Sequence, residues 1–147
     1  MTAELIRKHK ADAFVMLTIH NPDQGVFYLK ENANSMFSAF IKTKKDFEDY
    51  EKAGVPFNQL IAYIGPLVKP ENQELYAMLN KKGAMCMISA ASTYDKLKTA
   101  EERKAAYISI AKDGASILES DYPIEAAEAV RSLQKRDSPK QRFLGRK

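Results

Sequence analysis

The stretch Gly114-Ala-Ser-Ile-Leu-Glu-Ser-Asp-Tyr-Pro123 decides the fold class, because it carries three structural signals in direct succession. Gly114 closes the amphipathic stretch before it, since glycine adopts the left-handed conformation at a helix end at little cost. Residues Ala115–Glu119 form a short, largely apolar run of the length of a buried strand. Pro123 stands where proline favours the first turn of a helix. The stretch therefore predicts a helix, a strand and a second helix.

The same order of signals recurs through the chain. Short apolar runs that predict strands occur at Phe14–Ile19, Met36–Ile41, Leu60–Ile64, Ala84–Ser89 and Ala115–Glu119. The segments between them are amphipathic; in residues 69–83, Leu75, Met78 and Leu79 follow the spacing of a one-faced helix. Strands and helices are therefore expected to alternate.

The junctions between these segments support the alternation. Glycines that would end helices are Gly54, Gly83 and Gly114. Signals that would begin helices are Asn21-Pro22, the capping boxes Thr43/Asp46 and Thr99/Glu102, and Pro123 after Asp121, which we expect to cap the last helix. The residues that begin and end helices and the pattern of apolar residues thus predict the same elements.

Alternating strands and helices indicate βαβ units and a parallel sheet. Two architectures fit this pattern, an open doubly wound sheet and a (β/α)8 barrel or a piece of one. The phosphate-binding patterns GxGxxG and GxxxxGK[ST] are both absent from the sequence, which disfavours a nucleotide-binding open sheet. The pattern by itself leaves both architectures open.

The amino-acid composition limits the classes of partner that the protein is expected to bind. The 147 residues are 45% apolar and 29% charged, as in one globular domain, and no apolar run is long enough to span a membrane. The net charge of +4 comes from residues 131–147, where seven basic side chains face one acid; residues 1–130 carry −2. Basic charge confined to a polar tail does not predict nucleic-acid binding. We expect a domain over residues 1–134 and a basic, flexible tail over 135–147.

The predicted strands, in their order along the sequence, resemble the strand motifs of a known family. Gly114–Pro123 is similar to the closing strand of the glycerophosphodiester phosphodiesterase family, G-x-D-x-I-x-T-D-x-P, and Lys82–Ser89 is similar to its penultimate strand, a Gly before an apolar run ending in W-T-V-N. Phe14–Asn21 and Met36–Ile41 would then be the fifth and sixth strands, and Leu60–Pro66 an extra strand-like piece. The resemblance implies the C-terminal part of a (β/α)8 TIM barrel related to the phosphatidylinositol phospholipase C barrels. Ser116 and Ser120 depart from the family's Asp and Thr, and its Trp is missing from Met85–Ser89.

The family's catalytic motifs are not in this sequence. In the family, an H-R-G strand end, an E-N-T turn, an E-x-D pair and a second His come from the first four strands and serve a divalent cation, Ca²⁺ or Mg²⁺. No His-Arg-Gly occurs here, and His9 and His20 are the only histidines. Five βα units also fall short of the eight strands of a closed barrel. We expect no catalytic residue and no metal site in this segment alone.

Polar residues at the predicted carboxyl ends of the strands are the candidate substrate-binding residues, because barrel active sites lie there. They are His20, Lys42, Ser89, Glu119 and Asp121, with Thr18, Ser38 and Tyr63 nearby and Tyr94-Asp95-Lys96 in the loop after the penultimate strand. Lys42 begins a basic cluster with Lys44 and Lys45 at a strand-to-helix junction, where an anion would be favoured. Cys86 lies between apolar neighbours and is expected to be inert core.

The sequence thus predicts a segment of a phosphoric diester hydrolase that, when whole, would cleave a small glycerophosphodiester to glycerol phosphate and an alcohol. The isolated chain should be inactive. The alternative is a noncatalytic half barrel kept for association, through self-association or pairing with a missing N-terminal half. A third reading is an open sheet that binds a phosphorylated small molecule. The sequence leaves the location open: we expect a cytoplasmic location for the chain as given, and export if an upstream signal exists.

Overall fold

The computed structural model describes residues 2–11, 14–66 and 69–133, where helices and strands alternate. The strands are β1 (Met16–Ile19), β2 (Met36–Phe40), β3 (Leu60–Gly65), β4 (Met85–Ser89) and β5 (Ile117–Glu119). The helices are α1 (Thr2–Lys8), α2 (Pro22–Glu31), α3 (Lys44–Lys52), α4 (Pro70–Lys81), α5 (Ala100–Lys112) and α6 (Pro123–Val130). Short 3-10 turns lie at Phe57–Gln59, Tyr94–Lys96 and Arg131–Leu133. The predicted tail over 135–147 lies outside the described residues.

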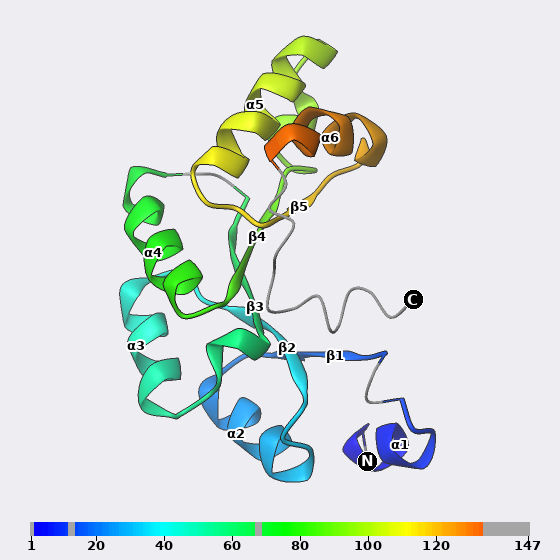
Figure 1. Ribbon diagram of the computed structural model, residues 1–147, viewed down its shortest axis with the longest axis vertical. Coiled ribbons are helices and arrows are strands. Elements are labelled where there is room, and N and C mark those ends of the chain that lie inside the picture. Colours follow the sequence, from blue (N-terminus) through cyan, green and yellow to red (C-terminus); the bar gives the residue numbers. More distant parts are fainter. Residues whose placement is uncertain (1, 12–13, 67–68, 134–147) are drawn as a thin grey trace.

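The strands form one parallel sheet in the order β1-β2-β3-β4-β5. Each strand therefore lies beside its neighbours in sequence, and the described order contains no reversal. An open doubly wound sheet needs such a reversal, because its ligand crevice forms there. The order is instead that of consecutive strands in a (β/α)8 barrel wall. Figure 1 shows the twisted sheet with α2, α3 and α4 following one another along one side and α5 and α6 beside β5.

The third strand corrects one prediction. Leu60–Pro66 was expected to be an extra piece outside the barrel series, but β3 lies at the centre of the sheet and pairs with both β2 and β4. If β5 is the closing eighth strand, β1 takes the fourth place and not the fifth. The apolar run of β3 is buried on both faces, as expected for a central parallel strand.

Local signals fix the helix ends as the sequence predicts. Asn21 caps α2 with Pro22 in the first turn, and Thr43 and Thr99 close reciprocal capping boxes with Asp46 and Glu102. Gly54 and Gly83 have φ angles of 77° and 83°, the left-handed conformation that favours glycine. The caps at Asn21, Thr43 and Thr99 set where the loops at the carboxyl ends of the strands end, and Gly54 and Gly83 end helices at the opposite edge of the sheet.

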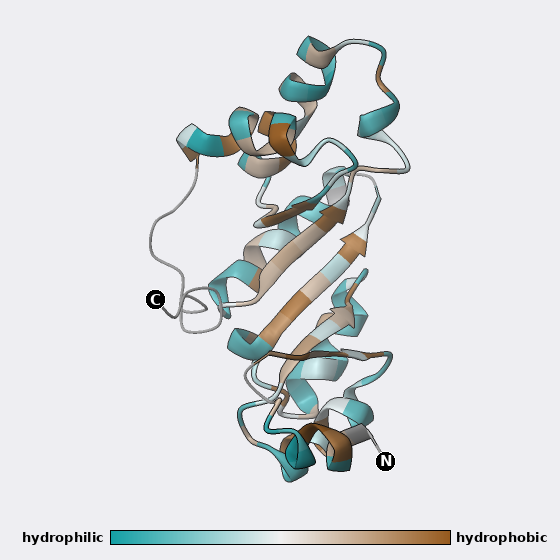
Figure 2. Ribbon diagram, turned by 90° about the vertical axis from the view of Figure 1, so that its right-hand side faces the viewer, coloured by the Kyte–Doolittle hydropathy of each residue, from teal (hydrophilic) through white to brown (hydrophobic). Residues whose placement is uncertain are grey.

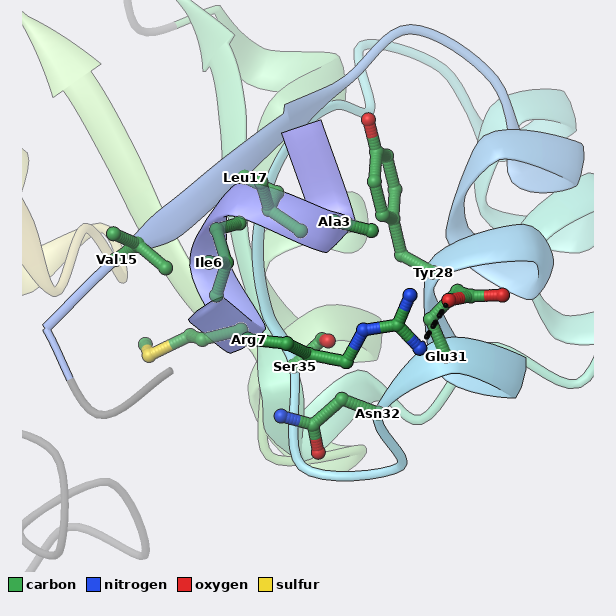
Figure 3. Close-up of a pocket in the computed structure, with 10 residues that line it drawn as sticks. Ala3, Ile6, Arg7, Val15, Leu17, Tyr28, Glu31, Asn32 and Ser35 are labelled. Atoms are coloured by element: carbon green, nitrogen blue, oxygen red, sulfur yellow. Dashed lines mark ion pairs between the residues drawn. The ribbon is translucent and has the colours of Figure 1, made fainter. Parts of the chain in front are cut away.

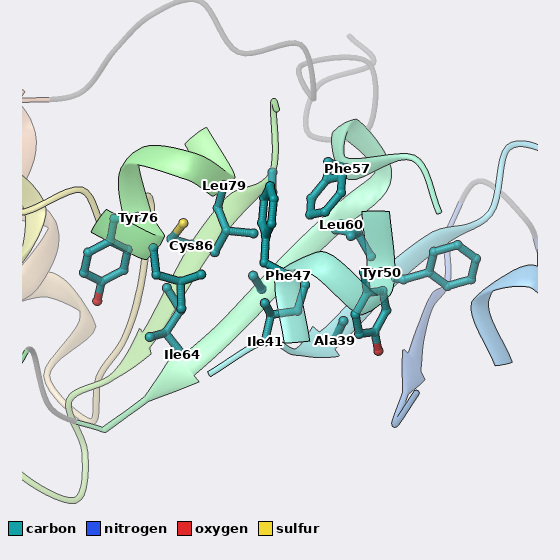
Figure 4. Packing of buried hydrophobic residues seen from close by; sticks show 14 of the residues in the cluster. Ala39, Ile41, Phe47, Tyr50, Phe57, Leu60, Ile64, Tyr76, Leu79 and Cys86 are labelled. Atoms are coloured by element: carbon teal, nitrogen blue, oxygen red, sulfur yellow. The ribbon is translucent and has the colours of Figure 1, made fainter. Parts of the chain in front are cut away.

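The two faces of the sheet have different surroundings. Alternate residues of the strands, including Ala39, Ala62, Cys86 and Ile88, pack against helix residues such as Leu79 in one continuous core, part of which Figure 4 draws. Cys86 is fully buried in this core. Figure 2 shows apolar colour along the strands and hydrophilic colour over much of the helices. The face that packs against the helices is thus the outer side of the barrel wall, and the opposite face of the sheet corresponds to the barrel interior.

Among the residues that the structure describes, no helix is long and apolar enough to cross a membrane.

Candidate functional site

The face of the sheet opposite the described helices carries side chains in ordered rows. The pairing registers align Thr18, Ser38, Ile61 and Met85 in one row and Phe40, Tyr63, Met87 and Ile117 in the next. Such rows correspond to the side-chain layers that fill a barrel interior. The second row lies nearer the carboxyl ends of the strands, where a barrel active site opens. Polar and aromatic residues in this row and beyond it therefore form the candidate site.

His20 directly follows β1 and lies beside Phe40 of the neighbouring strand. The two rings are stacked, with centroids 5.8 Å apart and 10° between their planes. The backbone N–H of His20 donates to the Gln24 side chain at 2.8 Å, which fixes the turn into α2. Both His20 and Phe40 are exposed. The stack leaves the imidazole edge available to a ligand at the mouth of the sheet.

Lys42 lies over the same aromatic surface. Its Nζ is 5.4 Å from the centroid of the Phe40 ring and 5.7 Å from that of Tyr63, within the range of cation–π attraction. The backbone N–H of Lys42 donates to the Asp46 carboxylate at 2.9 Å, so the capping box of α3 anchors the base of the side chain. No carboxylate of the described residues forms an ion pair with Lys42, whereas Lys44 pairs with Glu74 at 3.7 Å and Lys45 with Asp49 at 2.6 Å. Of the predicted basic cluster, Lys42 alone thus presents an uncompensated charge within the part of the chain that the structure describes.

Tyr63 completes this group, which we call the mouth cluster: His20, Phe40, Lys42 and Tyr63. Its ring meets Phe40 edge to face, with centroids 5.4 Å apart. The register between β3 and β4 shifts between Tyr63 and Gly65, an irregularity of the kind that re-aims side chains beside active sites. The cluster therefore joins the carboxyl ends of β1, β2 and β3 through ring contacts.

Ser89 and Glu119 form a second pair on the same face. They end β4 and β5 and are register partners in the parallel ladder. Ser89 is half-buried and Glu119 is exposed, and the backbone carbonyl of Glu119 accepts a hydrogen bond from Ala90 N–H at 2.7 Å. Since β3 lies between β2 and β4, this pair is set apart from His20 and Lys42 along the sheet.

Asp121 does not cap the last helix as expected. The cap residue of α6 is Tyr122, whose side chain makes no capping hydrogen bond, and its backbone N–H donates to Ser120 Oγ at 3.0 Å. The backbone N–H of Asp121 instead donates to the Asp95 carboxylate at 2.6 Å. The Asp121 side chain is exposed, close in sequence to Glu119. Its place at the mouth follows from the backbone bond and not from helix capping.

Asp95 is the buried centre of a polar network under this loop. Its carboxylate accepts from the Tyr107 hydroxyl at 2.6 Å, from Ser120 Oγ at 3.0 Å and from Asp121 N–H. Burial, and then the hydrogen bond to Asp95, raise the pKa of Tyr107 to about 12. Predicted as a ligand-reaching loop residue, Asp95 is only 6% exposed and is engaged within the protein. It positions the β5–α6 loop and does not face a ligand.

The described residues do not offer a metal site. No group of three or more His, Cys, Asp or Glu side chains among them is arranged to hold a metal ion. His20 has aromatic and cationic neighbours, which do not ligate a cation. The donor set of the described residues therefore does not fit the divalent cation implied by the family resemblance.

The mouth cluster suits an anion with a small organic group attached. An ammonium over two rings, with no paired carboxylate among the described residues, attracts a negative charge, and the ring faces offer apolar contact to carbon atoms. Phe40 was not among the predicted site residues, because it lies within an apolar run of the sequence. The alternation Ser38, Phe40, Lys42 could have placed it on the same face as Lys42.

Comparison with known proteins gives one informative match. No family model matches the chain, and a search of curated proteins found no match. A crystal structure of a glycerophosphoryl diester phosphodiesterase from Parabacteroides distasonis ATCC 8503 superposes with a TM-score of 0.84 and is 46% identical in sequence. The match covers 97% of this chain and 50% of that one, so the chain spans half the length of that relative. It confirms the predicted barrel-fragment fold.

Proposed function

Because the chain belongs to the glycerophosphodiester phosphodiesterase family and corresponds to the C-terminal part of its barrel, we propose that it forms one wall of a phosphodiester-hydrolysing site. The whole site would cleave a small glycerophosphodiester to glycerol phosphate and an alcohol. This chain would supply part of the substrate rim, and the half that it lacks would supply the reacting groups.

The observation that carries the proposal is the mouth cluster. A phosphodiester bears one negative charge shared by two free oxygens, and Lys42 is a cation with no carboxylate partner among the described residues. Its ammonium can donate to either oxygen while the Phe40 and Tyr63 rings hold its stem in place. Lys is a common phosphate ligand of this kind, acting as a compact point charge.

The other residues of the rim have supporting roles. His20 can hydrogen-bond a phosphate oxygen or a glycerol hydroxyl from its position against Phe40. The Phe40 ring is partly exposed and offers apolar contact to the glycerol carbons. Ser89, Glu119 and Asp121, at the ends of β4 and β5, are placed to accept or donate hydrogen bonds to hydroxyl groups of the substrate or its alcohol.

Hydrolysis itself requires groups beyond this segment. Attack on phosphorus needs a base and an acid placed within hydrogen-bond reach of the entering and leaving oxygens. The mouth cluster offers one imidazole, and no carboxylate of the described residues forms an ion pair with it. A divalent cation would neutralise charge on the phosphate when bound. We therefore propose that the isolated chain binds the phosphate group weakly and does not cleave the diester.

Binding and turnover can be tested separately on the isolated chain. Titration with glycerol 3-phosphate, followed by ¹H–¹⁵N NMR, should shift the amide signals of His20 and Lys42 and leave those of Leu79 and Tyr107 unchanged. Lys42→Gln should weaken binding about three- to tenfold, and Lys44→Gln, which removes a paired surface lysine, should not. Shifts that do not involve the mouth cluster, or equal weakening by the two substitutions, would contradict the assignment.

A further inference from the structure

We infer that Arg103 is a positioning residue for the substrate rim: it holds Tyr122, and so fixes the Asp121 carboxylate as an acceptor for substrate hydroxyl groups. The inference rests on the proposed function, since it takes Asp121 as part of the rim. It deepens that function by naming the residues that select a diester with free hydroxyls. Three features carry it: the contacts of Arg103, the bonds that hold the backbone around Asp121, and the state of the Asp121 carboxylate.

The guanidinium of Arg103 contacts three different parts of the chain. Its Nε and Nη2 donate to the two carboxylate oxygens of Glu125 on α6 at 2.8 and 2.9 Å. Its Nη1 donates to the backbone carbonyl of Leu97, in the loop before α5, at 3.0 Å. Its Cζ lies 4.4 Å from the centroid of the Tyr122 ring, within the range of cation–π attraction. Since the guanidinium is planar and its donors form a rigid fork, these contacts together fix where the Tyr122 ring lies.

A second arginine–glutamate pair provides a comparison within the same chain. Arg7 of α1 pairs with Glu31 at the end of α2 at 2.9 Å, as Figure 3 shows, and these side chains are 56% and 33% exposed. The exposed fractions of the Arg103 and Glu125 side chains are only 13% and 17%. Exposed ion pairs contribute little, whereas a sheltered arginine fork with two parallel bonds holds a defined geometry. The Arg103 pair is therefore suited to fixing a position.

The backbone on both sides of the Asp121 side chain is held by hydrogen bonds. The N–H of Asp121 donates to the buried Asp95 carboxylate at 2.6 Å, and the N–H of Tyr122 donates to Ser120 Oγ at 3.0 Å. Ser120 Oγ in turn donates to Asp95 at 3.0 Å. Arg103 adds a contact of another kind, because it acts on the ring of Tyr122 and not on its backbone. Asp121 is thus held from its amino side by Asp95 and from its carboxyl side by Arg103.

The Asp121 carboxylate itself is not engaged in the same way. The residue is exposed, and within the ranges that the structure describes no hydrogen bond or ion pair uses its side-chain oxygens. A carboxylate accepts hydrogen bonds from hydroxyl groups, and such charge-assisted bonds are strong. It repels a phosphate, because both groups are negative. A free acceptor on a held backbone therefore suits a hydroxyl group of the substrate, since the protein has already fixed its geometry.

The test compares two diesters of equal charge: glycerophosphoglycerol, which carries free hydroxyls, and diethyl phosphate, which carries none. Each is titrated into the full chain and followed by ¹H–¹⁵N NMR. The unmodified chain should bind glycerophosphoglycerol about three- to tenfold more tightly, and only this ligand should shift the Asp121 amide signal. Arg103→Lys keeps the charge but loses the fork. It should reduce the preference by about threefold or more and leave the affinity for diethyl phosphate unchanged.

Further variants separate positioning from stability. Tyr122→Leu removes the ring that Arg103 holds but leaves the pair with Glu125, so it should lower the preference even if Arg103→Lys folds poorly. Tyr122→Phe keeps the ring and should retain the preference. Lys104→Gln breaks an exposed pair of 3.9 Å with Glu128 between the same two helices, and as the matched control it should change neither affinity. Circular dichroism melts verify the folding of each variant.

Two results would overturn the inference. One is a preference for glycerophosphoglycerol that survives both Arg103→Lys and Tyr122→Leu, even where these variants melt at a lower temperature. The other is the absence of any preference in the unmodified chain. Failure of the proposed function is a different result: neither diester shifts the amide signals of His20 and Lys42, while the Asp121 amide still responds to glycerophosphoglycerol.

Discussion

The imidazole of His20 stacks on the ring of Phe40, with 5.8 Å between centroids and nearly parallel planes. The contact joins the carboxyl ends of β1 and β2, and Lys42 Nζ lies 5.4 Å from the centroid of the same Phe40 ring. Phe40 therefore organises both of the candidate ligand-binding side chains. Its role can be separated from theirs by substitution.

Phe40→Leu should weaken glycerol 3-phosphate binding about two- to fivefold, because the stack and the cation–π contact are lost while the apolar volume is kept. The free energy of unfolding should fall by no more than about 1 kcal/mol, since the ring is partly exposed. NMR titration and urea unfolding measure the two effects. Phe27→Leu is the control, an exposed ring outside the mouth cluster. Unchanged affinity in Phe40→Leu would contradict an organising role.

Two buried tyrosines should respond oppositely to loss of their hydroxyl groups. The Tyr50 hydroxyl is buried and has no hydrogen-bond partner among the described residues, whereas that of Tyr107 donates to Asp95 at 2.6 Å. Tyr50→Phe should leave stability at pH 7 unchanged or raise it by up to about 1 kcal/mol, because an unsatisfied polar group is removed. Tyr107→Phe should cost about 1–3 kcal/mol. Urea unfolding compares them, and a larger loss in Tyr50→Phe would contradict the structure.

The same tyrosines predict sensitivity to alkali. Burial raises the pKa of Tyr50 from 10.0 to about 12, and burial with the Asp95 hydrogen bond does the same for Tyr107. The folded state then holds these protons more tightly than the unfolded state does. Their contribution to stability is complete below pH 10 and is lost as the pH rises toward 12, by up to about 1.4 kcal/mol per pH unit for each group. Tyr50→Phe should flatten this decline in unfolding free energy; an unchanged slope would contradict the assignment.

Asp95 is expected to hold the β5–α6 loop in place. Asp95→Asn keeps the volume but replaces one acceptor oxygen by a donor, so the bonds from Tyr107, Ser120 and Asp121 cannot all remain. The free energy of unfolding should fall by about 2–3 kcal/mol, and the Asp121 amide should exchange with solvent faster. Asp49→Asn, which loses only an exposed pair with Lys45, should cost less than about 0.5 kcal/mol. Slow Asp121 exchange in Asp95→Asn would argue against the network.

Gly114 and Gly54 provide a matched pair for backbone strain. Both have positive φ, 117° and 77°, but a Cβ on Gly114 would lie 2.9 Å from the Cβ of Tyr76, while one on Gly54 would meet nothing within 4 Å. Gly54→Ala should cost about 1 kcal/mol from conformation alone. Gly114→Ala should cost about 1–3 kcal/mol more, since Tyr76 must move. Thermal unfolding ranks the two, and equal melting temperatures would show that the site can relax.

The sequence predicted the local structure well, because helix ends and buried parallel strands leave short-range signals. The capping residues Asn21, Thr43 and Thr99 each occupy their expected place. Leu60–Pro66 was wrongly predicted to lie outside the series of barrel strands, because the strands were numbered by resemblance to the family and not by the regular spacing of the apolar runs. Strand order is a long-range property, and the pairing of β3 with both neighbours cannot be derived from its own residues.

The candidate site was predictable in part. His20 and Lys42 follow predicted strands, so their place at the carboxyl edge could be inferred, but their shared contact with Phe40 depends on register between strands. Asp95 was misjudged for a related reason. An acidic residue in a loop is expected from the sequence to be exposed to solvent. The burial of Asp95 instead depends on Tyr107 and Ser120, which lie 12 and 25 residues further along the chain. Local patterns do not contain that information.

The most direct test of the central claim is the rate of glycerophosphocholine hydrolysis with Mg²⁺ or Ca²⁺ present. It would be measured for the purified chain alone and after co-assembly with the complementary half from the solved relative. We expect no turnover above background for the chain alone and measurable turnover for the assembly, reduced by Lys42→Gln. Hydrolysis by the purified chain alone, at the rate of the assembly, would contradict it.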